Sequence, residues 1–189
     1  MTKYILHGGI KEDGEYKKDF FDEMVLSLPQ KKLTVLYVPF GESEEKKQKN
    51  TEIKQKQFDS FLTQKTTTVV KAEEDIEKFL DQTHNADIVY FGGGNTKSMI
   101  DFLKKIPLDI LIQHLNNKVI VGVSAGANSL SKYYFSLHRQ RIEEGLGIIP
   151  IKTICHYTLE KEPQLEELEN YKEHLTSFAL PEDYFVIIS

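Results

Sequence analysis

A serine occupies the centre of Gly122-Val123-Ser124-Ala125-Gly126, which fits the G-x-S-x-G pattern of a nucleophile elbow. The apolar, β-branched run 119–123 predicts a buried strand before Ser124, and residues 127–130 are compatible with a helix after it. A sharp strand-to-helix turn projects the hydroxyl above the sheet from a strained backbone. The amides at the start of the helix can then hold an oxyanion. The alternative is an ordinary turn in which Ser124 only caps the helix.

A glycine-rich turn, Gly92-Gly93-Gly94-Asn95-Thr96, follows the predicted strand 88–91 and precedes a predicted helix. It lacks the glycine spacing of dinucleotide-binding folds and the Lys of a P-loop. Together with a nucleophilic serine, it is better suited to donate backbone N–H groups from Gly93 or Gly94 to an oxyanion, paired with the N–H of Ala125. Asn95 and Thr96 are candidate helix caps and candidate substrate-binding residues. The alternative is a turn that needs glycine only for its backbone geometry.

A serine is a weak nucleophile and needs an adjacent base. Among the six histidines, His156 follows the predicted strand 148–155, and strand ends form the usual functional edge of a parallel sheet. His7 also ends a predicted strand and is the second candidate. A carboxylate must orient the imidazole and stabilise its cation. Glu182 and Asp183 both precede the last predicted strand, and their spacing does not choose between them.

The elements that must position these residues alternate along the chain. Short apolar runs bounded by Gly or Pro predict strands at 4–6, 33–38, 67–70, 88–91, 119–123, 148–155 and 184–188. Amphipathic stretches predict helices at 19–28, 43–61, 72–80, 97–104, 108–115 and 165–175. This alternation predicts an α/β fold, a three-layer α/β/α sandwich with a mostly parallel sheet.

The helix predicted at 43–61 contains the most biased segment, the Lys-rich residues 44–56. Its mixed charges are typical of a solvated helix face. Ser43 is the candidate N-cap, and Ile53, Phe58 and Phe61 are the residues expected to face inward.

Length and composition limit the possible functions. A chain of 189 residues predicts a single domain over 1–189. The net charge of -5 argues against non-specific nucleic-acid binding and against binding to anionic membranes. Cys155 is the single cysteine, so no intramolecular disulfide or Cys-based zinc site is expected. The sequence shows no metal-ligand spacing, and we expect neither a metal nor a cofactor. We expect a cytoplasmic location, because no secretory signal and no long apolar stretch are visible. We also expect a monomer or homodimer.

Four motifs resemble peptidase family S51, which includes aspartyl dipeptidase (peptidase E) and cyanophycinase. They are GGGNT at 92–96, GVSAGAN at 122–128, CHYT at 155–158 and ALPED at 179–183. The resemblance implies a class I glutamine amidotransferase-like fold and a serine hydrolase without a cofactor. It further implies that Ser124 is the nucleophile, His156 the base and Glu182 the orienting acid, with the glycines at 92–94 forming the oxyanion turn.

The resemblance also implies a substrate class. Peptidase E-like members cleave a dipeptide or short peptide after an N-terminal aspartate. Aspartyl dipeptidases carry an acidic residue shortly after the elbow, whereas residues 131–141 of this chain carry His138, Arg139 and Arg141. Arg139, Arg141 and Lys161 are candidates to receive a substrate carboxylate.

Other functions remain open at the level of sequence. An α/β-hydrolase esterase has its triad in the order Ser, acid, His, which makes His174 the base. A glutamine amidotransferase carries a cysteine at the elbow, where this chain has Ser124. The alternative outside enzymes is a binding or regulatory module that keeps the elbow only as a structural turn.

Overall fold

A six-stranded sheet forms the centre of the computed structural model, which describes residues 1–10 and 17–189. In spatial order its strands are β10 (Phe185–Ile188), β1 (Lys3–His7), β5 (Val119–Val123), β4 (Ile88–Phe91), β2 (Lys32–Val38) and β3 (Thr66–Lys71). β10 is antiparallel to β1, and the other neighbours pair in parallel. The carboxyl ends of β1, β4 and β5 therefore meet at one edge of the sheet.

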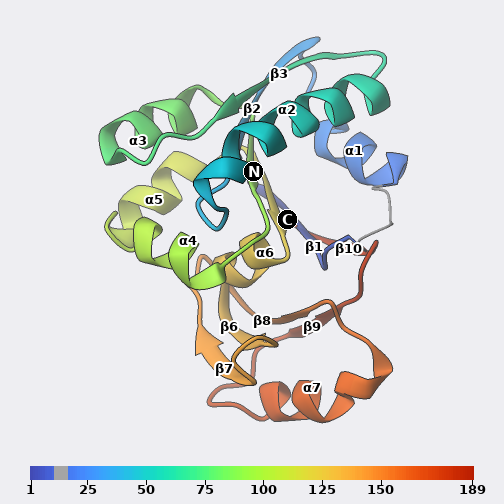
Figure 1. Cartoon of the computed structure of the whole chain (residues 1–189), viewed down its shortest axis with the longest axis vertical. Helices are drawn as coiled ribbons and strands as arrows, with labels where there is room; N and C mark the ends of the chain where they lie inside the picture. The colour runs from blue at the N-terminus through green and yellow to red at the C-terminus, as the bar shows by residue number, and fades with distance from the viewer. Residues whose placement is uncertain (11–16) are drawn as a thin grey trace.

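Helices cover both faces of this sheet (Figure 1). One face packs against α1 (Lys18–Val25) and α2 (Glu44–Phe61) through a core that includes Phe20 and Phe58. The other face carries α3 (Ile76–Asn85), α4 (Thr96–Leu103), α5 (Leu108–Leu115) and α6 (Ala125–Leu130). The predicted three-layer α/β/α sandwich with a mostly parallel sheet is confirmed. No helix in the described part of the chain is both long and apolar enough to cross a membrane.

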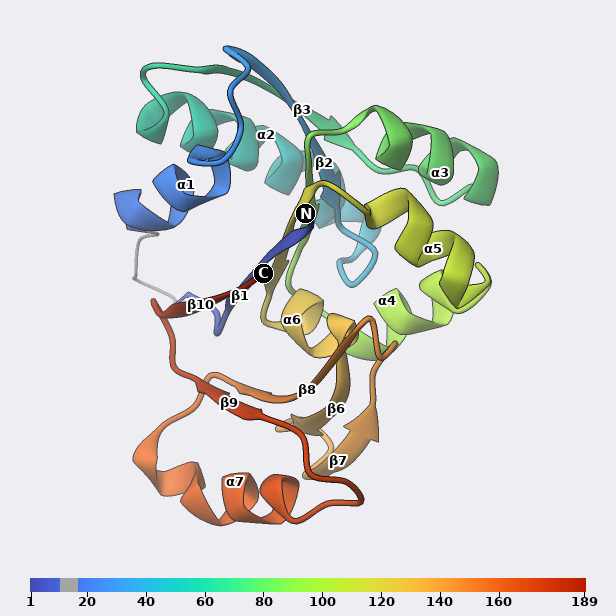
Figure 2. The ribbon, with the colours of Figure 1, turned by 180° about the vertical axis from the view of Figure 1, so that it is seen from behind.

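A second sheet, which the sequence did not predict, lies at one end of the molecule (Figure 2). Its order is β7 (Arg141–Glu144), β6 (Ser131–Ser136), β8 (Ile149–Cys155) and β9 (Ser177–Leu180). The 3-10 helix η1 (Leu159–Lys161) leads into α7 (Glu162–Glu169), which packs on this sheet through Leu168. The strand predicted at 148–155 is therefore present as β8, but it belongs to the second sheet and not to the parallel sheet.

The short helix α6 joins the two sheets. It follows β5 of the first sheet and runs directly into β6 of the second, and all of its residues are buried. A Cβ added at Gly126 would overlap the carbonyl oxygen of Phe91 at the end of β4. Because only glycine allows this close approach, the start of α6 lies directly against the strand ends. Ser124, which immediately precedes α6, is thereby fixed between the two sheets.

The charged helix α2 differs in detail from its prediction. Ser43 precedes the helix, but its side chain makes no capping hydrogen bond. Phe58 is fully buried as predicted, whereas Ile53 is 38% exposed and the prediction that it faces inward is wrong. Lys47 and Lys54 are buried in its place, since their long aliphatic stems can cover apolar surface.

Candidate active site

The backbone of Ser124 has the geometry of an elbow. Its φ is 51° and its ψ is -105°, a conformation that costs free energy for any residue with a side chain. The N–H of Ser124 donates to the carbonyl oxygen of His7 at 2.9 Å, which ties the turn to the end of β1. An added Cβ at Gly122 would lie 2.8 Å from the amide nitrogen of Ala127. Small residues on both sides of the serine are therefore required by close backbone packing.

A hydrogen-bonded chain links three side chains. The hydroxyl Oγ of Ser124 lies 2.7 Å from Nε2 of His156, and Nδ1 of His156 lies 2.9 Å from Oε1 of Glu182. A carboxylate at Nδ1 favours the tautomer with the proton on that nitrogen, which leaves Nε2 to accept the serine proton. The side chains of His156 and Glu182 are 37% and 27% exposed. The site is thus partly shielded yet open to a ligand.

The histidine and the acid reach Ser124 from the second sheet. His156 directly follows β8, and its N–H donates to the carbonyl oxygen of Gly8 at 3.0 Å. Glu182 lies on the connection from β9 to β10, where the chain returns to the first sheet. Asp183, the other acid left open by the sequence, instead donates its backbone N–H to the carbonyl oxygen of Gly9 at 2.9 Å.

Backbone N–H groups with no acceptor in the part of the chain that the structure describes lie at the elbow and on the glycine turn that follows the adjacent strand. β4 and β5 pair in parallel through Phe91 and Gly122, so the glycine turn and the elbow follow adjacent strand ends. The N–H groups of Gly93, Gly94 and Ala125 find no acceptor among residues 1–10 and 17–189. A Cβ added at Gly93 would meet no atom within 4 Å, so this part of the turn faces open space. The arrangement can donate hydrogen bonds to an oxygen bound beside Ser124.

A hollow of about 430 Å³ adjoins the glycine turn. It is lined by Gly94, Asn95, Thr96, Lys97, Tyr134, Ser136, His138, Arg139 and Glu143. Asn95 also caps α4, because its side chain accepts the N–H of Ser98 at 3.1 Å. The structure therefore gathers the predicted residues Asn95, Thr96 and Arg139 in one place.

The sequence analysis missed Glu143, which pairs with two arginines at this hollow and next to it. Arg139 and Arg141 both donate to its Oε1, at 2.9 and 2.8 Å, and Tyr134 donates to Oε2 at 2.9 Å. Burial opposes ionisation, but the hydrogen bonds from Arg141, Tyr134 and Arg139 lower the pKa of Glu143 overall. Arg141 does not line the hollow, and the ammonium of Lys161 contacts the carbonyl oxygen of His156. No sequence pattern marks this pairing, which depends on the β6–β7 register.

His7, the second candidate base, is buried and makes a hydrogen bond within the turn after β1. It is 1% exposed, and burial lowers its pKa to about 4. Its Nδ1 accepts the N–H of Gly9 at 3.1 Å. The imidazole that contacts the hydroxyl of Ser124 is that of His156.

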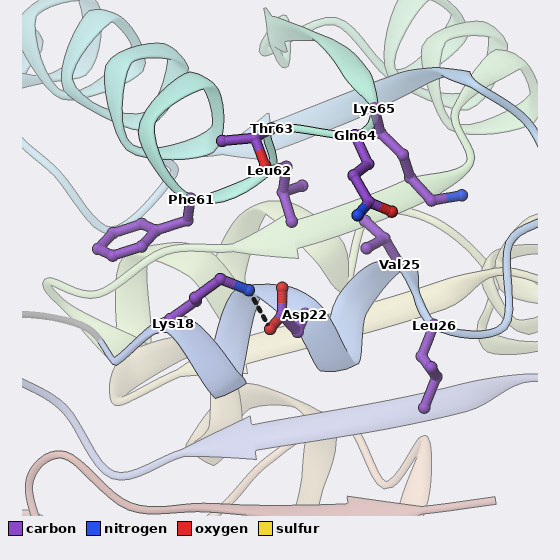
Figure 3. A pocket seen from close by; sticks show the side chains of 9 residues that line it. All are labelled: Lys18, Asp22, Val25, Leu26, Phe61, Leu62, Thr63, Gln64 and Lys65. Atoms are coloured by element: carbon purple, nitrogen blue, oxygen red, sulfur yellow. Dashed lines mark hydrogen bonds and ion pairs between the residues drawn. The ribbon is translucent and has the colours of Figure 1, made fainter.

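A separate hollow of about 420 Å³ lies between α1 and the end of α2 (Figure 3). It is lined by Lys18, Asp22, Val25, Leu26, Phe61, Leu62, Thr63, Gln64 and Lys65. The segments that carry these residues lead into the amino ends of β2 and β3, at the sheet edge opposite Ser124. The lining contains no histidine, cysteine or serine, and Lys18 and Asp22 form an ion pair. Among the described residues, no group of His, Cys, Asp or Glu is arranged to hold a metal ion.

The fold and the elbow define a class, the α/β sandwich proteins with a serine at a sharp strand-to-helix turn. The sequence profile of peptidase family S51 matches residues 4–189. The chain belongs to peptidase family S51 and is a peptidase.

Two solved structures are similar to the chain over nearly its whole length. A peptidase from an acI-B1 Actinobacterium has a TM-score of 0.72 and 20% sequence identity, covering 99% of this chain and 83% of its own. A protein assigned as peptidase E from Listeria monocytogenes EGD-e has a TM-score of 0.68 and 17% identity, covering 100% and 94%. At these identities the likeness shows a shared fold. No curated protein matches the chain.

Proposed function

We propose that the protein is a serine-type peptidase that cleaves short peptides through an acyl-enzyme on Ser124. Dipeptides with an N-terminal aspartate are the first substrates to test. The observation that carries this proposal is the chain of contacts from Ser124 Oγ to His156 Nε2 and from His156 Nδ1 to Glu182, at 2.7 and 2.9 Å. These distances are those of a nucleophile next to its base and of a base next to its orienting acid.

Each proposed step uses a group at the site. Ser124 attacks the peptide carbonyl while Nε2 of His156 takes its proton, and Glu182 stabilises the imidazolium that forms. The oxyanion accepts N–H groups from Ala125 and from the turn at 92–94. His156 then donates the proton to the leaving amine. Water attacks the acyl-enzyme in the second half of the reaction, with His156 again acting as the base.

The charges beside the glycine turn support a short substrate. A peptide of two or three residues carries an ammonium and a carboxylate close to the scissile bond. The hollow next to the turn presents the cations of Lys97 and Arg139 together with the carboxylate of Glu143. A guanidinium is well suited to bind a carboxylate with paired hydrogen bonds. The carboxylate of such a peptide can therefore bind Arg139 by displacing Glu143, with which the guanidinium is paired in this structure.

Replacement of the proposed nucleophile tests the function directly. We expect Ser124→Ala to lower kcat/KM for a hydrolysed peptide by at least about 1,000-fold, because the acyl-enzyme can no longer form. A fluorophosphonate probe is expected to label the wild type and not the variant. Ser98→Ala, at an exposed serine of α4, is the matched control and keeps both properties.

Two results contradict the proposal. Unchanged hydrolysis by Ser124→Ala places the reaction elsewhere. Absence of both labelling and hydrolysis in the wild type, over a panel of aspartyl dipeptides and other short peptides, favours a non-catalytic binding module.

A further inference from the structure

The turn that follows β1 contacts the backbone of each segment that carries the proposed triad. The carbonyl oxygen of His7 accepts the N–H of Ser124 at 2.9 Å. The next carbonyl, that of Gly8, accepts the N–H of His156 at 3.0 Å. The third, that of Gly9, accepts the N–H of Asp183, the residue after Glu182, at 2.9 Å.

These three segments come from distant parts of the chain. The serine follows β5 of the first sheet, the histidine follows β8 of the second, and the acid lies between β9 and β10. Three successive carbonyl groups on one turn therefore fix the relative positions of backbones that are otherwise far apart in sequence. A change in the shape of this turn would displace all three.

The side chain of His7 makes a hydrogen bond within this turn. Its Nδ1 accepts the N–H of Gly9 at 3.1 Å, a bond across two residues that closes the turn. The imidazole ring lies with its centroid 4.6 Å from that of Phe20, so it is held from the other side by packing. Because burial lowers the pKa of His7 to about 4, Nδ1 keeps its lone pair at neutral pH.

Gly8 and Gly9 pack so closely against the segments of the triad that neither position has room for a side chain. A Cβ added at Gly9 would overlap the imidazole ring of His156, and one added at Gly8 would overlap the carbonyl oxygen of Pro181. Gly9 also has a φ of 126°, which side chains rarely adopt. The turn thus contacts the ring of the base and the segment of the acid directly, in addition to its hydrogen bonds.

We propose that His7 is a positioning residue: by closing the Gly8–Gly9 turn it sets the geometry of Ser124, His156 and Glu182. The inference rests on the proposed serine peptidase function and assigns His7 no contact with substrate. It extends the site from the three side chains to the end of β1.

Two substitutions at one position separate the hydrogen bond from the packing. His7→Phe keeps a ring of similar size against Phe20 and removes the acceptor. His7→Asn loses the ring but retains a side-chain oxygen, which readily accepts an N–H two residues on. We expect His7→Phe to lower kcat by about 100-fold, with KM within about threefold, as for a small misplacement of reacting groups. The kcat of His7→Asn is expected to be at least about tenfold higher than that of His7→Phe.

Urea unfolding identifies any variant that fails to fold, and a second pair of variants then carries the test. Gly9→Ala is expected to push the ring of His156 away and to lower kcat as His7→Phe does. Gly147→Ala is the matched control: its φ of 70° is also positive, but the nearest atom to an added Cβ is 3.8 Å away. Wild-type kcat in Gly9→Ala, or equal losses in His7→Phe and His7→Asn, overturns the inference.

A readout without turnover separates this inference from the proposed function. The proton on Nδ1 of His156, held by Glu182, gives a downfield proton resonance that is assigned by its loss in His156→Gln. We expect this resonance to disappear in His7→Phe and to return in His7→Asn, whether or not any peptide is hydrolysed. An unchanged resonance in His7→Phe overturns the positioning role. Failure of the serine mechanism appears instead as an unlabelled, inactive wild type.

Discussion

Ser124, His156 and Asp183 have positive φ angles of 51°, 52° and 63°. Residues with a side chain pay a free-energy cost for this conformation, and they keep it only where surrounding contacts enforce it. The carbonyl groups at the end of β1 supply such contacts, since each accepts the N–H of one of these three residues. Three of the six non-glycine residues with positive φ in the described chain therefore lie in the segments that carry the proposed triad.

The choice between the two acids before β10 leads to a prediction. Glu182→Gln keeps the size of the side chain but removes the charge that stabilises the imidazolium and fixes its tautomer. We expect kcat to fall by about 1,000-fold. Asp183→Asn is expected to cost far less, because asparagine tolerates positive φ and keeps the backbone N–H. Steady-state kinetics of both variants on one peptide decide the matter, and a larger loss in Asp183→Asn would contradict the assignment.

Ser124 and His156 were predicted from the sequence on different grounds. The G-x-S-x-G pattern between a strand and a helix is local, so Ser124 was predicted from its own neighbours. His156 was selected because it follows a predicted strand, but that strand lies in the second sheet. The choice of Glu182 over Asp183 depends on the direction of two adjacent side chains, which spacing alone does not determine. His7 was considered only as a second candidate base, because the contacts of its turn join segments that are far apart in the sequence.

At the scale of elements, the strands of the first sheet were predictable and most of the second sheet was not. Strands buried on both faces are continuous apolar runs, as in β4 and β5. β7, in contrast, has the sequence Arg-Ile-Glu-Glu, and β9 has the sequence Ser-Phe-Ala-Leu, so neither contains a β-branched apolar run like that of β4. The helix α6 is only six residues long, which hid the change of sheet between β5 and β6.

The glycine turn after β4 gives a prediction at the same scale. Gly93→Ala adds a methyl group that meets no atom within 4 Å, so the free energy of unfolding should be unchanged or slightly raised. Because the methyl group points into the open space of the turn, we expect kcat/KM to fall by about tenfold or more. Urea unfolding and peptide hydrolysis measure the two effects.

The neighbouring glycine provides the contrast. Gly94 has a φ of 107°, and an added Cβ would overlap the carbonyl oxygen of Gly41. We expect Gly94→Ala to lower the free energy of unfolding, unlike Gly93→Ala. Wild-type kcat/KM in Gly93→Ala would show that this turn does not adjoin the reacting carbonyl.

At the scale of the whole molecule, a buried cation joins the second sheet to its helix α7. Lys152 of β8 is fully buried, and its ammonium donates to the carbonyl oxygens of Glu169 and Tyr171 at 2.8 Å each. These carbonyls lie at the end of α7, where a cation is favourable. The second sheet and its helix therefore pack as one unit.

The buried imidazole at the end of β1 makes the stability of the molecule depend on pH. Burial lowers the pKa of His7 from 6.5 to about 4; Lys54 and His156 add to the lowering, while Asp183 and Asp19 oppose it. Between these values the unfolded chain binds more protons at His7 than the folded chain does. The contribution of His7 to the free energy of unfolding is fully present above about pH 6.5 and is lost as the pH falls toward 4. The total loss is about 3 kcal/mol.

Urea unfolding of the wild type and of His7→Phe between about pH 7 and about pH 4.5 measures this contribution. The wild type is expected to lose more free energy of unfolding than the variant over this range, because phenylalanine cannot take up a proton. Parallel curves for the two proteins would contradict the lowered pKa of His7.

The antiparallel pairing of β10 with β1 has a consequence for when the proposed catalytic site is completed during synthesis. On the ribosome, β1, the elbow and β8 are synthesised well before the segment that carries Glu182 and enters β10. A nascent chain can therefore fold most of its first sheet while the imidazole still lacks its carboxylate. Hydrolysis by the proposed mechanism begins only when the last strand of the described chain docks beside the first.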